Sequence, residues 1–326
     1  MRRSCVYLRL VRYITVWNSI FLMGLIAACV NLTPAQGWAC ACGCGVFQVG
    51  TPSILPNGPG GTVWLEYDYM DQYLNWHATE IASANKNDDK EIRTHFLTLG
   101  VQYMFNHDWG LMLEAPYWYR YFKTTTDSGA IDGFNFNGIG DIRIEGMYTG
   151  LSEDMSTGLL AGVKVPSGYW TYPNADRDTQ IGTGSTDLLL GGYHQGTLPY
   201  LTFRDRPFNW FSQLSYDWPL FSQDEYRPGR EFDGSMGAYY NLGTVGFLKE
   251  LAPMLTFIGS DRTRDHGSAS DPQDSGYDRV LVAPGAEIKI GILRIYGDVE
   301  VPIFQNMTGN QLTAPVLFKT IFSYDF

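Results

Sequence analysis

The sequence has little charge and, after its first 30 residues, no long apolar run. Charged residues make up 17% of the 326 residues, and the 23 Lys and Arg are outnumbered by 34 Asp and Glu. Nucleic acid is excluded as a partner, because phosphate binding needs a basic surface. The mean hydropathy of −0.16 excludes a polytopic helical membrane protein, which would need several apolar stretches of about 20 residues.

Glycine and aromatic residues, by contrast, are abundant. The chain has 36 Gly, 18 Phe, 21 Tyr and 9 Trp, and so many aromatic side chains exclude a disordered chain. The sequence shows no amphipathic helix of any length. The apolar residues must therefore lie in short segments in which polar and apolar residues alternate. The composition fits one all-β domain better than two soluble domains.

The first 39 residues have the three-part plan of a secretory signal peptide. Four arginines and no acidic residue stand in 1–12, the largely apolar segment 14–30 follows, and 31–39 ends in small residues at the positions that a signal peptidase reads. We expect export and cleavage after Ala39, which would leave Cys40 as the mature N-terminus.

Two other interpretations of this leader are open. Residues 14–30 could be a membrane anchor, although Asn18 and Ser19 interrupt them and their length barely spans a bilayer. Leu25-Ile-Ala-Ala-Cys29 resembles a lipobox, and processing there would leave a lipidated Cys29 that anchors the protein.

From Gly61 onward, about twelve segments of about ten residues alternate between polar and apolar residues. This period of two is the weak signature of transmembrane β-strands. We therefore predict that 61–326 is an antiparallel up-and-down β-barrel of about twelve strands, of the bacterial outer-membrane type. The expected strands are 61–70, 92–105, 109–122, 138–149, 157–167, 185–195, 208–219, 232–242, 247–260, 277–289, 292–304 and 313–326.

The connections between these strands alternate in length. Long polar connections (71–91, 123–137, 168–184 and 261–276) follow odd-numbered strands, and short ones (106–108, 150–156, 243–246 and 290–291) follow even-numbered strands. Outer-membrane barrels have long external loops and short periplasmic turns, so this alternation favours a barrel over a soluble sandwich. The connection 196–207 is too long for the turn expected there.

Charged and apolar residues fall on opposite faces of the predicted strands. In 109–122 the row from Leu111 to Tyr121 is apolar and ends in aromatics, whereas Glu114 and Arg120 lie on the other face. Terminal aromatics favour a lipid-facing outer surface, because Trp and Tyr concentrate at membrane interfaces. The candidates for the lumen are then Glu114, Arg120, Asp141, Arg143, Glu145, Lys164, Asp187, Asp298 and Glu300.

The last residues alternate in the same way. Phe318, Phe322, Tyr324 and Phe326 share one face, and Lys319 lies on the other. This closing aromatic strand resembles the carboxy-terminal signal of outer-membrane barrels, which the barrel assembly machinery reads. We therefore expect the protein in the outer membrane of a Gram-negative bacterium, with membrane lipid around the barrel.

Three glycine-rich stretches lie at ends of predicted strands: Gly138-Ile-Gly-Asp141, Gly162-Val-Lys-Val-Pro-Ser-Gly168 and Gly182-Thr-Gly-Ser-Thr-Asp187. They resemble the outer-membrane channel family associated with the meta-pathway of phenol degradation, which implies a barrel that passes small, often apolar molecules. From the residues alone, Asp141, Lys164 and Asp187 point into the lumen of adjacent strands, where they could form a structural ion network or a binding site.

Three of the five cysteines lie in one short segment, and the other two, Cys5 and Cys29, lie in the leader. Cys40, Cys42 and Cys44 lie in 40–60, which we assign to the periplasm, and the predicted barrel has no cysteine. A disulfide or a tether to a periplasmic partner is the first interpretation. Three thiolates at alternate positions could instead bind a soft metal such as Cu(I) or Zn(II), and a segment without a role is the third alternative.

The sequence predicts a monomeric, non-enzymatic channel for a small, apolar solute, without a cofactor in the barrel. Twelve strands should leave a narrow or partly obstructed lumen. His95 is expected in a lipid-facing row and has no companion catalytic pattern. The alternative function is a barrel sheath or docking protein that holds a periplasmic redox or metal-binding partner through Cys40–Cys44.

Overall fold

The computed structural model describes residues 51–326 except 57, 127, 204 and 205. This part of the chain is almost entirely β-structure, and none of its helices is long and apolar enough to span a bilayer. The short 3-10 helices are η2 (Pro52–Ile54) and η3 (Ala84–Lys86). The strands are β1 (Gly60–Gln72), β2 (Leu74–Ala78), β3 (Glu80–Ile81), β4 (Asp89–Met104), β5 (Trp109–Thr125), β6 (Ile131–Ile139), β7 (Ile142–Tyr148), β8 (Thr157–Val165), β9 (Asp187–Phe203), β10 (Arg206–Pro219), β11 (Glu231–Tyr239), β12 (Glu250–Arg262), β13 (Tyr277–Ile290), β14 (Leu293–Thr313) and β15 (Leu317–Asp325).

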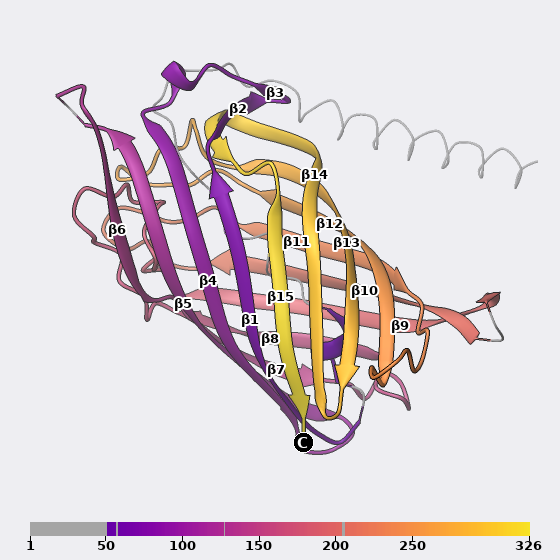
Figure 1. The fold of residues 1–326 in the computed structure, drawn as a ribbon. Helices are drawn as coiled ribbons and strands as arrows, with labels where there is room; N and C mark the ends of the chain where they lie inside the picture. The colour runs from indigo at the N-terminus through magenta and orange to yellow at the C-terminus, as the bar shows by residue number, and fades with distance from the viewer. Residues whose placement is uncertain (1–50, 57, 127, 204–205) are drawn as a thin grey trace, which may run out of the picture. The chain divides into compact units, whose positions relative to one another are not determined.

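Twelve of the strands close into an antiparallel barrel (Figure 1). Strands that are adjacent in the ring follow one another in the chain, and β1 closes the ring by pairing with β4 on one side and β15 on the other. The other three described strands extend the wall at one end, where β6 pairs with β5, and β2 pairs with β14 and β3. The predicted twelve-stranded barrel is therefore confirmed.

The two rims of the barrel differ. One end carries β2, β3 and the long loops 166–186 and 263–276, and we call it the loop rim. The other end carries short turns such as 105–108 and 291–292, together with Phe326, and we call it the turn rim (Figure 1). The division follows the predicted alternation of long and short connections.

The connection expected at 123–137 is largely a strand. β6 pairs with the last nine residues of β5, with Ile131 opposite Thr125 and Ile139 opposite Tyr117. Polar and glycine residues at 133, 135 and 137 hide this strand in the sequence, because its apolar positions are few. Next to it, β7 pairs with the first part of β5. The strand predicted at 138–149 therefore corresponds to the end of β6 and to β7, which are separated by two residues.

The prediction of a long connection at 196–207 is wrong. β9 and β10 continue through this segment and pair up to Phe203 and Arg206. The register shifts between Pro207 and Phe208, which leaves 199–201 without partners, and Pro199 falls in this irregularity. Bulges tolerate proline, whereas regular strand interiors do not, so the predicted strand ends were placed too early and the structure has an extended hairpin here.

Side chains alternate between the lumen and the outer surface. In β15, Lys319 and Ile321 are buried, whereas Phe318 and Phe322 are each 41% exposed. The same division holds in β5, where Arg120 and Phe122 are buried and Tyr119 is exposed. The buried core of this fold is therefore the filled interior of the barrel, with charged as well as apolar side chains in it.

Candidate functional site

The nine charged residues expected in the lumen lie on the inner side of the barrel wall, eight of them in strands and Asp141 just before β7. Seven of them are buried, namely Arg120, Asp141, Arg143, Glu145, Asp187, Asp298 and Glu300, and Glu114 and Lys164 are half-buried. The structure brings them together in separate groups that contact different loops. Each group can be built from its backbone positions.

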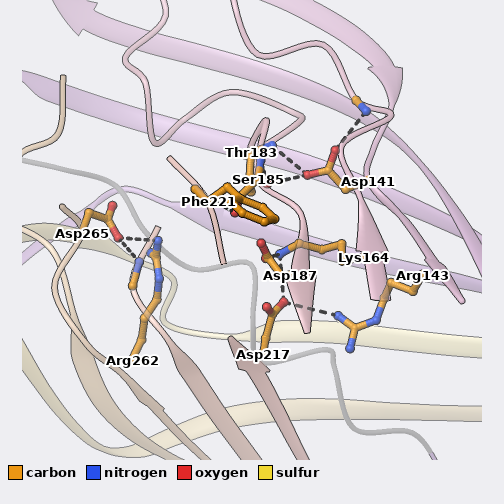
Figure 2. Close-up of polar contacts among 12 residues, drawn as sticks. Asp141, Arg143, Lys164, Thr183, Ser185, Asp187, Asp217, Phe221, Arg262 and Asp265 are labelled. Carbon is orange, nitrogen blue, oxygen red and sulfur yellow. Dashed lines mark hydrogen bonds and ion pairs between the residues drawn. The ribbon is translucent and has the colours of Figure 1, made fainter. Parts of the chain in front are cut away.

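Asp141 joins the three glycine-rich stretches singled out in the sequence (Figure 2). Its Oδ1 atom accepts the backbone N–H of Gly168 at 3.0 Å, and its Oδ2 atom accepts the backbone N–H and the hydroxyl of Thr183 at 2.8 and 2.7 Å. The expected ion pair with a lumen cation is thus replaced by hydrogen bonds to loop backbone. These bonds hold both ends of the loop 166–186 beside β7.

Gly168 and Gly182 lie against each other at this point. A Cβ atom on Gly168 would come within 2.7 Å of the Gly182 Cα atom, and one on Gly182 would come within 2.4 Å of the Gly168 carbonyl carbon. Only glycine permits such a close approach of two backbones. Gly168 and Gly182, which belong to two of the glycine-rich stretches, are therefore required by close backbone packing.

A second group is an ion network across β5, β7, β8, β9 and β10. Lys164 pairs with Asp187 and lies 2.8 Å from Asp217, and Arg143 lies 3.5 Å from Glu114 and 3.9 Å from Asp217 (Figure 2). Asp217 was not among the sequence candidates, although its position in the alternating segment 208–219 places it on the inner face. Most of these charges have a partner of opposite sign, as buried charges require.

A third group surrounds Lys319 on the inner wall of β1, β15 and β14. Lys319 lies directly opposite Asp68 in β1 and opposite Asp298 in β14. Its Nζ atom lies 3.5 Å from Glu66, and Glu300 is a further electrostatic neighbour. One ammonium group therefore stands among four carboxylates, of which the sequence analysis named only Asp298 and Glu300.

Arg120 connects the inner wall with the loop 166–186. Its guanidinium donates from Nε to the Thr94 hydroxyl at 2.9 Å and from Nη1 to the carbonyl of Thr179, and it lies 5.2 Å from the Trp118 ring centroid. The same loop packs Ile181 against Phe122 and Phe136. The loop therefore folds into the barrel mouth and packs there.

Residues 51–55 cross the lumen near the turn rim. Ile54 is 5% exposed and packs with inward-facing residues that include Trp64, Phe211 and Tyr296. Leu55 is 3% exposed and packs with Met147, Leu160 and Tyr193 from another part of the wall. We call 51–55 the N-terminal turn. These residues lie in the segment 40–60 that we expected in the periplasm, and nothing in their pattern marks them as lumen filling.

Cavities lie on both sides of this turn. One of them, which we call the vestibule, has about 1230 Å³ of empty space, part of it open to solvent, and reaches from the loop rim to Glu66, Glu114 and Arg143. The same three residues line an inner cavity of about 560 Å³ that ends at Ile54 and Leu55. Pro52 and Ser53 face another cavity of about 840 Å³. The described lumen is thus a series of cavities interrupted by the N-terminal turn.

Asp274 fixes the loop 263–276 at the loop rim. It is 2% exposed, and its Oδ1 atom accepts the backbone N–H of Asn310 at 2.5 Å, while its Oδ2 atom has no hydrogen-bond partner. Burial raises the pKa of Asp274 to about 7, and the negative charge of Asp271 adds to this shift against the opposing Asn310 bond. This loop therefore contains a group that can titrate near neutral pH.

The remaining predicted sites are the N-terminal leader, the cysteine-rich segment and the aromatic row at the C-terminus. The signal peptide, Cys29 and the segment with Cys40, Cys42 and Cys44 lie outside the described residues, and within the described residues no group of His, Cys, Asp and Glu is arranged to hold a metal ion. The side chains of Phe318, Phe322, Tyr324 and Phe326 lie on the outer surface.

His95 lies on the outer surface of β4. Its Nδ1 atom is 2.9 Å from the Tyr67 hydroxyl, and its ring contacts those of Tyr69 and Tyr119. These neighbours are amphipathic aromatics of the kind that gather at a membrane interface. His95 is therefore part of an outer aromatic cluster.

Comparison with known proteins gives similarity in fold. No family model matches the chain, and no curated protein matches its sequence. The COG4313 outer membrane channel from Pseudomonas putida F1 matches with a TM-score of 0.61 at 11% identity, over 85% of this chain and 100% of that one. The β domain of the Bordetella autotransporter BrkA matches with a TM-score of 0.47 at 13% identity, over 82% of this chain and 100% of that one. The Ralstonia pickettii toluene transporter TbuX matches with a TM-score of 0.39 at 11% identity, over 82% of this chain and 90% of that one. The match to the COG4313 channel shows that this chain has the fold of an outer-membrane channel barrel.

Proposed function

We propose that the protein is a monomeric channel that carries small solutes with apolar bodies across the outer membrane of a Gram-negative bacterium. The observation that carries this proposal is the series of cavities through the barrel. The vestibule opens at the loop rim, and further cavities follow down to the N-terminal turn and beyond it. In outer-membrane barrels the long loops are external, so the vestibule would face the medium.

The wall of the vestibule fits solutes with apolar parts. Phe96 and Trp118 contact each other edge to face at 4.9 Å between ring centroids, and Pro116 and Ile181 line the same cavity. An aromatic and aliphatic wall with a few polar groups is typical of sites that bind small organic molecules. The fold that the chain shares with a solved outer membrane channel supports the same function.

Filling the vestibule tests the proposal. Thr98 lies on the inner wall and lines this cavity, so Thr98→Trp should obstruct it. Thr320, on the outer row of β15, offers a matched control, Thr320→Trp. Cells that produce the wild type or Thr320→Trp should take up the uncharged fluorophore N-phenyl-1-naphthylamine faster than cells without the protein, and Thr98→Trp should remove most of this gain. Equal uptake by both variants would contradict a path through the vestibule.

A further inference from the structure

The vestibule has an excess of negative charge. Among the described residues, seven carboxylates and four cationic side chains line it, which leaves three more negative than positive groups. Several of these carboxylates are engaged, as Glu114 and Asp217 are by Arg143 and Asp141 is by loop backbone. Only the remaining carboxylates of the vestibule are therefore available to a positively charged ligand.

Among the described carboxylates that line the vestibule, Asp68 has no ion pair and one oxygen without a hydrogen-bond partner. It is 1% exposed, and the oxygen without a partner is Oδ1. Lys319 lies opposite Asp68 and acts on it electrostatically. Within the described residues, however, no cation forms an ion pair with Asp68 within 4 Å, and the ion pair of Lys319 is with Glu66, at 3.5 Å. A buried carboxylate without a partner is costly, and a cation that enters the cavity would remove that cost.

The carboxylate excess continues below Asp68. Glu300 is fully buried and neither of its carboxylate oxygens has a hydrogen-bond partner, and the Oδ1 atom of Asp298 lacks one as well. Both residues line a small cavity of about 240 Å³ that reaches Thr51 at the N-terminal turn. Unsatisfied negative groups thus follow the lumen from the vestibule toward the turn.

The strand register places an aromatic wall beside Asp68. Asp68 in β1 lies directly opposite Phe96 in β4, and Phe96 lies directly opposite Trp118 in β5. Directly opposed residues in antiparallel strands have Cβ atoms about 5 Å apart. A carboxylate and two aromatic rings therefore stand in one row on the same inner wall, within the length of a small aromatic amine.

We propose that the solute of this channel is a small organic cation, an amine with an apolar body, which binds with its ammonium group at Asp68 and its apolar part against Phe96 and Trp118. The inference rests on the proposed channel function and narrows it to one class of solute. Aromatic faces also attract cations, so the two sides of the site favour the same ligand. Uncharged and anionic analogues of the same size lack the contact with Asp68.

Isothermal titration of the purified, full-length protein in detergent tests this site. The probes are benzylammonium, benzyl alcohol and phenylmethanesulfonate, which share one ring and differ in charge. We expect the cation to bind at least about tenfold more tightly than the other two, as a charge-assisted contact allows. Asp68→Asn should reduce that affinity about tenfold, Asp68→Glu should retain part of it, and the control Asp108→Asn, at an exposed turn, should leave it unchanged.

The outcomes separate the two proposals. Equal affinity for all three probes, or no binding of the cation, would overturn the cation site and leave the channel intact, because channel function is judged by the Thr98→Trp uptake experiment. If Asp68→Asn does not fold, the preference of the wild type among the three probes decides. Preference for the cation that survives in folded Asp68→Asn would also overturn the assignment to this residue.

Discussion

Asp68 and Lys319 lie directly opposite each other in the pairing of β1 with β15, yet the Nζ atom of Lys319 lies 3.5 Å from Glu66. Asp298 faces Lys319 from the other neighbouring strand. A single ammonium group cannot balance the carboxylates around it, and burial makes the imbalance expensive. The closure of the barrel thus creates a negatively charged stretch of wall from residues that are far apart in the sequence.

Asp141 should control the order of the loop 166–186. Asp141→Ala leaves the backbone N–H groups of Gly168 and Thr183 without their acceptor, at a cost of about 1–3 kcal/mol for each buried group. The barrel wall keeps its strand pairing, so we expect faster protease cleavage inside the loop without loss of the folded barrel. Asp154→Ala, at an exposed turn of the opposite rim, is the control. Equal cleavage of the two variants would show that Asp141 does not fasten the loop.

Gly168 should be intolerant of any side chain. In Gly168→Ala the new Cβ atom would lie 2.7 Å from the Gly182 Cα atom, so the two backbones must separate. The matched control is Gly146→Ala, whose Cβ atom would meet its nearest neighbour, the Ala161 carbonyl oxygen, at 3.6 Å. Thermal unfolding in detergent should show a lower midpoint for Gly168→Ala than for Gly146→Ala, and the reverse order would refute the close-packing argument.

Much of this architecture can be predicted from alternation alone. The row of Phe318, Phe322 and Tyr324 against Lys319 follows directly from a period of two, and the same period places the lumen acids. The partner that each acid meets cannot be predicted in this way. Lys319 reaches Glu66 only because the ring closes between β1 and β15, and this register depends on the whole barrel.

Other features leave almost no signal in the sequence. Ile54 and Leu55 belong to the N-terminal turn, a segment of five residues that contains Pro52 and has no hydrophobic periodicity. Their burial depends on the barrel that surrounds them. Asp141 alternates into the lumen as expected, but its partners belong to a loop whose path is set by glycine packing. Local pattern predicts strands and faces, whereas lumen filling is decided by tertiary contacts.

Phe326 should matter for assembly. Its backbone pairs with Gly61 at the closing seam, with N–O distances of 2.9 and 3.0 Å, and its exposed ring stacks on Tyr103. Phe326→Lys places a charge on the outer surface and removes the expected assembly signal, so we expect much less folded protein in the outer membrane. Ile292→Lys, in an exposed turn of the same rim, should assemble normally. The measurement is heat-modifiable gel mobility of outer-membrane fractions, and equal assembly of both variants would remove the argument for a terminal signal.

Asp274 should make the loop 263–276 sensitive to pH. Because its pKa is raised to about 7, the docked loop favours the protonated acid. The contribution to loop stability is complete below the ordinary carboxyl pKa near 4 and is lost as the pH rises to about 7. Proteolysis of the folded barrel should therefore cut this loop faster at pH 8.5 than at pH 5.5. Asp274→Asn resembles the protonated acid, so the protease should cleave the loop of this variant at similar rates at both pH values. If cleavage of the variant depended on pH as it does in the wild type, Asp274 would not be the titrating group.

The central claim is that solutes pass through the vestibule and past the N-terminal turn, which obstructs the same path. Single-channel conductance in planar bilayers tests it most directly. Replacing both Ile54 and Leu55 with Ala removes apolar contacts worth roughly 2–5 kcal/mol each and should free the turn from the wall. We expect larger conductance steps in this variant than in the wild type or in Leu151→Ala, at an exposed turn of the same rim, and adding Thr98→Trp should reduce them again. Steps that do not grow when the turn is freed, or that do not shrink when Thr98→Trp is added, would contradict a single path through the lumen.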